Sequence, residues 1–314
     1  MAEMVKKATR ESFGETVTAL AAEYPEIVVL DADLAAATKT GIFKKAYPER
    51  FFDCGIAECN MVGVAAGLAT CGKIPFAASF AMFSAGRAFE QVRNSVGYPK
   101  LNVKIVGSHA GISVGEDGAT HQCCEDIALM RTIPGMVILN PCDHYEMQAA
   151  VRAAVEHKGP CYIRLGRLAV ESINNNDDYK FELGKGITLR EGTDITVVAT
   201  GLMVQEAVKA ADALKEEGIS VEVINIHTIK PLDEELVIAS AKKTGRVITV
   251  EEHNIIGGLG EAVSTALSEH CPTPVTRIGV NDVYGHSGPA VDLLKEFGLS
   301  AEHIAAVIRE KLAK

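Results

Sequence analysis

Hydrophobic and polar positions alternate on two length scales through the first half of the chain. Short runs rich in β-branched residues are followed by longer stretches in which apolar positions recur at helical spacing. The runs that predict strands are Ile27–Leu30, Ile74–Ala78, Val103–Val106, Met136–Leu139 and Cys161–Arg164. The stretches that predict helices are Glu11–Ala22, Asn60–Cys71, Met82–Val96, Cys124–Arg131 and Tyr145–His157. This alternation predicts a parallel α/β sheet.

The polar stretch Glu171–Tyr179 interrupts the pattern, and the alternation then restarts. We therefore predict two parallel-sheet α/β domains, at 1–170 and 186–314, joined by a linker at 171–185. The expected strands of the second domain are Ile195–Ala199, Val221–Ile226, Val247–Val250 and Val275–Ile278, and its expected helices are Val204–Glu217, Gly260–His270 and Ser300–Lys314. Ser300 is the predicted N-cap of the last helix.

Composition narrows the class of protein. A chain of 314 residues that is 47% hydrophobic and 23% charged is ordinary for a soluble globular enzyme. A net charge of −10 without a basic block argues against nucleic-acid binding, and no run of 18 apolar residues predicts a membrane span. The eight cysteines show no CxxC spacing, so we expect reduced thiols in a cytoplasmic protein and no metal site.

Glu58 precedes an uncharged run, Met61–Ala69, which predicts a buried helix packed closely through Gly63, Ala66 and Gly67. A carboxylate in the first turn of a helix can simply complement the helix dipole, which stabilises by roughly a few tenths of a kcal/mol. It can also be a functional acid, because apolar surroundings raise the pKa of a carboxyl group while the helix N-terminus lowers it. The residues leave both interpretations open.

Three other segments combine residue types suited to binding. Phe80 and Phe83 could form either a core pair or an aromatic wall for a flat heterocycle. The glycine-rich loop 109–121 follows a predicted strand, which is where parallel sheets bind ligands. Arg10 precedes the first predicted helix, and the Arg164-Leu165-Gly166-Arg167 segment ends a strand; such arginines could clamp a phosphate or form structural ion pairs.

In the second domain, Gly257-Gly258-Leu259-Gly260 opens a predicted helix and could bind an anion. Without the rest of a dinucleotide fingerprint, close packing of a turn is the favoured interpretation. The segment 283–288, Val-Tyr-Gly-His-Ser-Gly, is equally ambiguous.

Together these segments resemble the thiamine-diphosphate enzymes of the transketolase family. The resemblance covers nearly the whole chain but only the second half of a full transketolase, its pyrimidine-binding and C-terminal domains. The segment 55–61, Gly-Ile-Ala-Glu-Cys-Asn-Met, looks like the family segment that carries an essential glutamate, which implies that role for Glu58. Phe80 and Phe83 match the aromatics that hold the aminopyrimidine ring, and Asp33 aligns with an acid near the cofactor.

The loop 115–121, Gly-Glu-Asp-Gly-Ala-Thr-His, is similar to the family signature that lines the substrate channel. By this resemblance His109, Asp117 and His121 contact the sugar substrate, the two histidines also act in catalysis, and Arg10 and Arg167 bind its phosphate. Two departures stand out. Ala37 replaces a phosphate-binding serine, for which Thr38 could substitute, and Gly86 replaces an aromatic residue.

Related classes of thiamine-diphosphate enzyme differ from this sequence at positions that can be compared directly. The 1-deoxyxylulose-phosphate synthases usually have Gly-Ala-Asp-Gly at 115–118 and no histidine at 109, and the beta subunits of 2-oxoacid dehydrogenases lack the GEDG-x-x-H loop. A non-catalytic α/β regulatory relative should have lost Glu58, Asp117 or the arginines, and all are present. Transketolase therefore fits best.

The resemblance implies transfer of a two-carbon ketol unit between sugar phosphates in pentose phosphate metabolism. The family holds its diphosphate through Mg²⁺ with a Gly-Asp-Gly segment and a later Asn, which this sequence lacks. We therefore expect an N-terminal partner subunit to hold the diphosphate and Mg²⁺, in an assembly of two copies of each chain.

Overall fold

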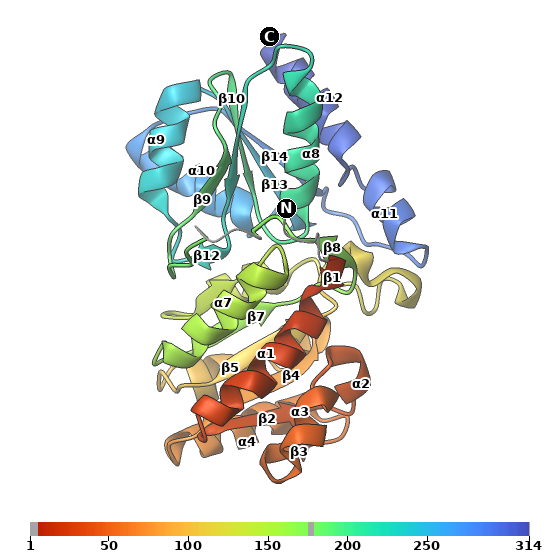
Figure 1. Ribbon diagram of the computed structural model, residues 1–314, viewed down its shortest axis with the longest axis vertical. Helices are drawn as coiled ribbons and strands as arrows, with labels where there is room; N and C mark the ends of the chain where they lie inside the picture. The colour runs from red at the N-terminus through yellow and green to blue at the C-terminus, as the bar shows by residue number, and fades with distance from the viewer. Residues whose placement is uncertain (1–5, 175–178, 314) are drawn as a thin grey trace.

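The computed structural model describes residues 6–174 and 179–313, so part of the predicted linker (175–178) and Lys314 lie outside the described residues. The chain forms two lobes, each built on a mainly parallel sheet with helices on both faces (Figure 1). This confirms the predicted fold class. No helix among the described residues is long and apolar enough to cross a membrane.

The first lobe holds the elements up to residue 171. Its strands are β1 (Lys6–Ala8), β2 (Ile27–Asp31), β3 (Phe51–Asp53), β4 (Ile74–Phe80), β5 (Lys104–Ser108), β6 (Val137–Leu139), β7 (Cys161–Arg164) and β8 (Ala169–Glu171). Its helices are α1 (Thr9–Glu23), α2 (Ala35–Thr38), α3 (Gly41–Ala46), η1 (Pro48–Arg50), α4 (Glu58–Thr70), η2 (Met82–Arg87), α5 (Phe89–Gln91), η3 (Val92–Gly97), η4 (Ile112–Asp117), α6 (Asp126–Arg131) and α7 (His144–Glu156).

The second lobe follows the linker. Its strands are β9 (Ile187–Arg190), β10 (Ile195–Ala199), β11 (Val221–Asn225), β12 (Thr228–Lys230), β13 (Val247–Asn254) and β14 (Val275–Val280). Its helices are α8 (Met203–Lys215), α9 (Glu234–Thr244), α10 (Leu259–His270), α11 (Ala290–Glu296) and α12 (Ala301–Leu312). The Ser300 side chain accepts a hydrogen bond from the His303 amide, which confirms the predicted N-cap of α12.

Alternating residues of the strands pack into two separate hydrophobic layers, one on each face of the first sheet, as expected for a sheet covered by helices on both faces. Ile27 and Val29 of β2 pack with α1 and α7 on one face, whereas Val28 and Leu30 pack with α4 and α6 on the other. Strands β2, β3, β4, β5, β6 and β7 are parallel to one another, so their carboxyl ends meet at one edge.

The two lobes are joined by a shared sheet and a shared hydrophobic core as well as by the linker. Strand β12 belongs to the second half of the chain but pairs antiparallel with β6, with Thr228 opposite Leu139, at the edge of the first sheet. The core around α4 and α6 continues into Ile224, Ile226 and Leu259 of the second lobe. The two large sheets each have an antiparallel strand at one edge, because β9 also pairs antiparallel with β11.

Two expectations about helices are corrected. Helix α4 is buried on one face only: Gly63 and Gly67 are exposed and would have no neighbour within 4 Å of an added Cβ atom. The stretch predicted as one helix from Met82 to Val96 is π-helical in η2 and η3, with the short α5 between them. π-Helical turns are often found at functional sites.

The glycine-rich start of α10 is a packing feature, as the sequence favoured. The amides of Leu259 and Gly260 donate to the two carboxylate oxygens of Glu251, at 2.6 and 2.8 Å. A Cβ atom at Gly258 would come within 2.0 Å of that carboxylate. An internal side chain therefore fills the position that an external anion would take.

A buried ion pair connects β7, α6 and β13. Arg164 donates from Nε to Asp126 Oδ2 at 2.8 Å and from Nη2 to the Glu252 carbonyl oxygen at 2.8 Å. The Tyr162 hydroxyl donates a hydrogen bond to the same Asp126 oxygen, at 2.7 Å. Arg164 therefore has a structural role, which was one of the two interpretations of its segment.

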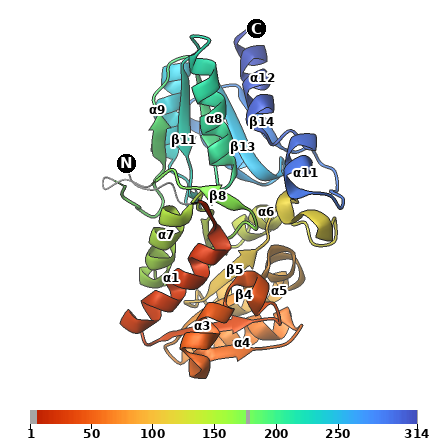
Figure 2. The same ribbon diagram turned by 45° about the vertical axis from the view of Figure 1, so that its right-hand side comes forward.

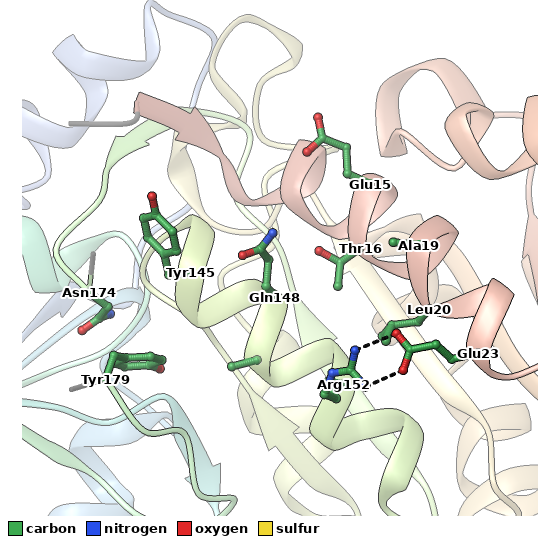
Figure 3. A pocket seen from close by; sticks show the side chains of 11 residues that line it. Glu15, Thr16, Ala19, Leu20, Glu23, Tyr145, Gln148, Arg152, Asn174 and Tyr179 are labelled. Atoms are coloured by element: carbon green, nitrogen blue, oxygen red, sulfur yellow. Dashed lines mark hydrogen bonds and ion pairs between the residues drawn. The ribbon is translucent and has the colours of Figure 1, made fainter. Parts of the chain in front are cut away.

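Replacing Arg164 should destabilise the fold strongly, because Asp126 would be left as an uncompensated buried charge. We expect Arg164→Met to lower the free energy of unfolding by about 3–5 kcal/mol, measured from the urea midpoint. The matched control is Arg152→Met, which removes a bidentate pair with Glu23 on the surface (Figure 3) and should leave the midpoint nearly unchanged. Equal shifts in the two variants would contradict this account.

Candidate active site

The candidate site lies where the carboxyl ends of β2, β4 and β5 meet the beginning of α4. Phe80 is the last residue of β4, His109 directly follows β5, and Glu58 is the first residue of α4. The parallel pairing of β4 with β5 brings Phe80 and His109 to the same edge of the sheet. A hydrogen bond from Ser79 of β4 holds Glu58 beside that edge.

Glu58 is almost fully buried, with 1% of its side chain exposed. Its Oε2 accepts a bond from Arg87 Nη1 at 2.8 Å, and its Oε1 accepts one from Ser79 Oγ at 3.4 Å. A carboxylate has about four lone-pair sites, so it can accept a further donor from a ligand. Neither Arg87 nor Ser79 was identified from the sequence, although Arg87 follows Phe83 at a spacing that places both on one helical face.

Four rings form an aromatic cluster beside this carboxylate. The Phe80 and Phe83 rings are nearly parallel, with centroids 6.1 Å apart and an interplanar angle of 13°. His109 stacks on Phe80 at 4.1 Å, and His121 meets Phe83 edge-on at 5.3 Å. The Arg87 guanidinium lies 4.3 Å from the centre of the Phe83 ring, which links the cluster to Glu58.

His109 is held as a neutral imidazole. Burial, followed by the charges of Arg10, Arg167 and Lys39, lowers its pKa to about 3. Arg10 Nη1 lies 3.3 Å from Nε2 and can only donate, so Nε2 is the acceptor and Nδ1 carries the proton toward Ser108 Oγ at 2.9 Å. The residue has φ of +56°, an uncommon backbone conformation that is often found at functional sites.

The two predicted phosphate-binding arginines lie close enough to His109 for both of their charges to lower its pKa. Arg10 donates to the Ala37 carbonyl oxygen at 2.8 Å, and its Nε is buried without a hydrogen-bond partner among the described residues. Arg167 donates to the Val114 carbonyl and to Glu116 Oε2, the latter at 2.6 Å. Burial and the nearby charge of Arg167 lower the pKa of Arg10, while Glu11 raises it.

The structure does not connect every predicted residue to this cluster. Asp33 and Asp117 are exposed, and within the described part of the chain no side-chain bond joins either of them to the rings. Thr38 cannot replace the missing serine hydroxyl at Ala37. It is fully buried, and its Oγ1 donates to Asp31 at 2.7 Å.

The second lobe supports the loop 109–121. The Ser113 amide donates to Glu252 Oε1 at 2.7 Å, and Gln122 donates to the His286 carbonyl oxygen at 3.0 Å. A Cβ atom at Gly111 would come within 2.3 Å of Glu252 Oε1. In both views the yellow loop after β5 lies beside α11 (Figures 1 and 2). The ambiguous segment 283–288 is therefore part of the support for this loop.

A cavity lies elsewhere, between α1, α7 and the residues 174 and 179 that flank the undescribed part of the linker (Figure 3). Its volume is about 710 Å³, and none of the predicted site residues lines it. Among the described residues, no group of three or more His, Cys, Asp and Glu side chains is placed to hold a metal ion. The eight cysteines are unpaired.

Comparison with known proteins identifies the class that this fold and site define. Residues 5–172 match the family described as "Transketolase, pyrimidine binding domain", and residues 184–304 match "Transketolase, C-terminal domain". The chain belongs to the transketolase family, whose members depend on thiamine diphosphate.

Relatives of the same extent and of twice the length are both found. The chain is 52% identical to a "Putative transketolase C-terminal section" of Methanocaldococcus jannaschii, over 99% of this chain and 98% of that protein. It is 39% identical to a human transketolase, over 98% of this chain but 50% of that protein. A solved structure described as "Split gene transketolase, inactive beta4 tetramer" matches with a TM-score of 0.91 and 52% identity, covering 98% of this chain and 99% of that one.

The protonation state of His109 gives a direct test of the site. We expect its imidazole ¹⁵N resonances to stay those of a neutral ring between pH 5 and 8, since its pKa is lowered to about 3. His286 is the internal control, because its hydrogen bond to Glu296 raises its pKa and it should titrate in the same spectra. A His109 resonance that titrates together with His286 would show that the burial and cationic surroundings described here are wrong.

Proposed function

We propose that this chain is the C-terminal half of a transketolase that moves a two-carbon ketol unit from a ketose phosphate to an aldose phosphate. The observation that carries the proposal is the buried Glu58 carboxylate beside the nearly parallel rings of Phe80 and Phe83. The expected setting is the pentose phosphate metabolism of the cytoplasm.

The cluster fits the aminopyrimidine of thiamine diphosphate. That ring is flat and carries ring nitrogens, and the site offers an aromatic wall with a desolvated carboxylate that has acceptor capacity to spare. When bound, the cofactor supplies the carbanion chemistry of ketol transfer. Glu58 would hold a proton at the ring nitrogen, while Phe80 and Phe83 stack on the ring and exclude water. Asp33 is proposed to lie near the bound cofactor.

The substrate would lie over the imidazole side of the cluster. His109 Nε2 would accept a sugar hydroxyl in place of its 3.3 Å hydrogen bond from Arg10, and His121 lies close enough to share that role in binding and proton transfer. Asp117 is proposed to meet a hydroxyl beside the reacting carbonyl. Arg10 and Arg167 would bind the distal phosphate, which positions the reacting end of the sugar.

The diphosphate and Mg²⁺ are assigned to an N-terminal partner subunit, in an assembly of two copies of each chain. Support comes from the sequence, which lacks the Gly-Asp-Gly segment with its later Asn, and from the equally short relatives. Phe52, Ile56 and Val64 expose apolar surface around α4, where an interface would cover it.

The related classes fit the geometry less well. A 1-deoxyxylulose-phosphate synthase-like enzyme does not account for His109, which is stacked on Phe80 and bonded to Arg10. An enzyme like the beta subunit of a 2-oxoacid dehydrogenase does not account for His121 of the GEDG-x-x-H loop, whose ring meets Phe83 edge-on. A non-catalytic regulatory relative would not need a buried Glu58.

Activity should require the partner. We expect the purified chain alone to show no measurable ketol transfer from a ketose phosphate to an aldose phosphate. Turnover should appear on addition of an N-terminal transketolase subunit with thiamine diphosphate and Mg²⁺, measured by coupled assay of the released aldose phosphate. Robust turnover without any partner would refute the split-site proposal, and no turnover with a partner that co-purifies would favour a non-catalytic role.

Glu58→Gln tests the role of the carboxylate. In the assembled pair we expect turnover to fall about 10²-fold or more, because an amide cannot take up and hold the ring proton, while the fold is retained. Glu26→Gln on the exposed turn before β2 is the isosteric control and should leave turnover unchanged. Near-normal turnover of Glu58→Gln would return Glu58 to the role of a residue that only complements the helix dipole.

A further inference from the structure

Lys39 is a third cation beside the candidate phosphate site, and neither motif nor spacing singled it out. It follows the short helix α2 as its C-cap residue and has φ of +68°. Its Nζ lies 3.5 Å from Oε1 of Glu11, the neighbour of Arg10. Its charge also contributes to the lowered pKa of His109, after burial and the charges of Arg10 and Arg167.

The backbone of Lys39 is fixed by the helix beneath it. A Cβ atom at Gly14 would come within 2.4 Å of the Lys39 carbonyl oxygen, so only glycine at that position of α1 allows the approach. This places α2 against α1, where the Ala37 carbonyl accepts the bond from Arg10 at 2.8 Å. Lys39 and Arg10 are therefore anchored on two elements that touch.

The side chain of Lys39 is free to exchange its partner. It is 31% exposed and Glu11 is 40% exposed, so their 3.5 Å pair is screened by water and weak. A lysine has three donors on a flexible stem, and a phosphate dianion competes well against a single exposed carboxylate. On α2 itself, Ala37 has no hydroxyl and the Thr38 hydroxyl is bonded to Asp31.

Arg10 has a hydrogen-bond donor that no described residue uses. Its Nε is buried and has no hydrogen-bond partner among the described residues. A buried N–H without a partner costs free energy, and an anionic oxygen at this point would satisfy it. The region around Arg10, Arg167 and Lys39 thus combines the unpaired Arg10 Nε donor with three positive charges.

We propose that Lys39 is a specificity-determining residue of this site: its ammonium group joins Arg10 and Arg167 in binding the phosphate at the end of the sugar remote from the reacting carbonyl. This inference rests on the proposed function for the identity of the sugar, but not for the binding of the anion. It predicts that the chain favours substrates with a dianionic end over their uncharged counterparts more strongly than the two arginines alone would.

The first experiment measures anion binding without turnover. The full chain is titrated with inorganic phosphate by calorimetry, as wild type and as Lys39→Met, and the variant should bind about tenfold more weakly. Lys45→Met on the exposed face of α3 is the control and should bind like the wild type. Glu11→Gln removes the competing carboxylate and should tighten binding. Equal affinities for wild type and Lys39→Met, or no binding by the wild type, would overturn the proposal.

The second experiment uses the assembled pair and separates recognition from chemistry. Lys39→Met should raise KM for a ketose phosphate about tenfold and leave kcat within about twofold, while KM for the same ketose without its phosphate stays unchanged. Lys39→Arg should restore most of the KM. An equal rise for both sugars would overturn the role in phosphate recognition. If the wild-type pair shows no ketol transfer, the proposed function fails, and the phosphate titration still decides the role of Lys39.

Discussion

The ion pair between Glu58 and Arg87 is the interaction on which the candidate site depends. Removing a carboxylate from water costs several kcal/mol unless charge and hydrogen bonds offset the loss. Arg87 supplies the opposite charge at 2.8 Å, and the beginning of α4 adds the positive end of a helix dipole. The same guanidinium lies over the Phe83 ring, so one side chain connects the buried acid to the aromatic wall. The pair therefore stabilises the buried carboxylate and connects it to the aromatic cluster.

The position of the substrate loop depends on a second set of buried charges. Arg164 and Asp126 hold the end of β7 against α6, and Arg164 also binds the carbonyl oxygen of Glu252. The Glu252 carboxylate in turn accepts a hydrogen bond from the backbone amide of Ser113, which lies within the loop. The second lobe thus contributes to the site, although none of its described residues belongs to the aromatic cluster. A substitution in β13 could in this way disturb residues of the first lobe.

Much of this arrangement follows from the sequence, because strand periodicity and strand ends are local properties. Glu58, Phe80, Phe83, His109 and His121 were all identified as candidates, and the structure brings the four rings together beside the acid. The fold class followed from the alternation of strands and helices.

Other features depend on contacts that periodicity does not encode. Strand β12 pairs with β6 across 89 residues or more of chain, and a three-residue strand carries too little pattern to be predicted. The open face of α4 was missed because small residues fit a tightly packed helix and an exposed one equally well. The loss of Thr38 as a phosphate ligand depends on its bond to Asp31, and the position of Lys39 depends on Gly14, 25 residues away in the chain.

The central claim is that Glu58 acts on the aminopyrimidine ring of a cofactor whose diphosphate another chain holds. It is tested most directly by ¹⁵N NMR of thiamine diphosphate labelled in that ring and bound to the assembled pair. The account predicts that the ring nitrogen facing Glu58 shifts toward the position of a protonated or strongly hydrogen-bonded nitrogen, and that Glu58→Gln abolishes the shift. The same shift in both proteins, or no shift in either, would contradict it.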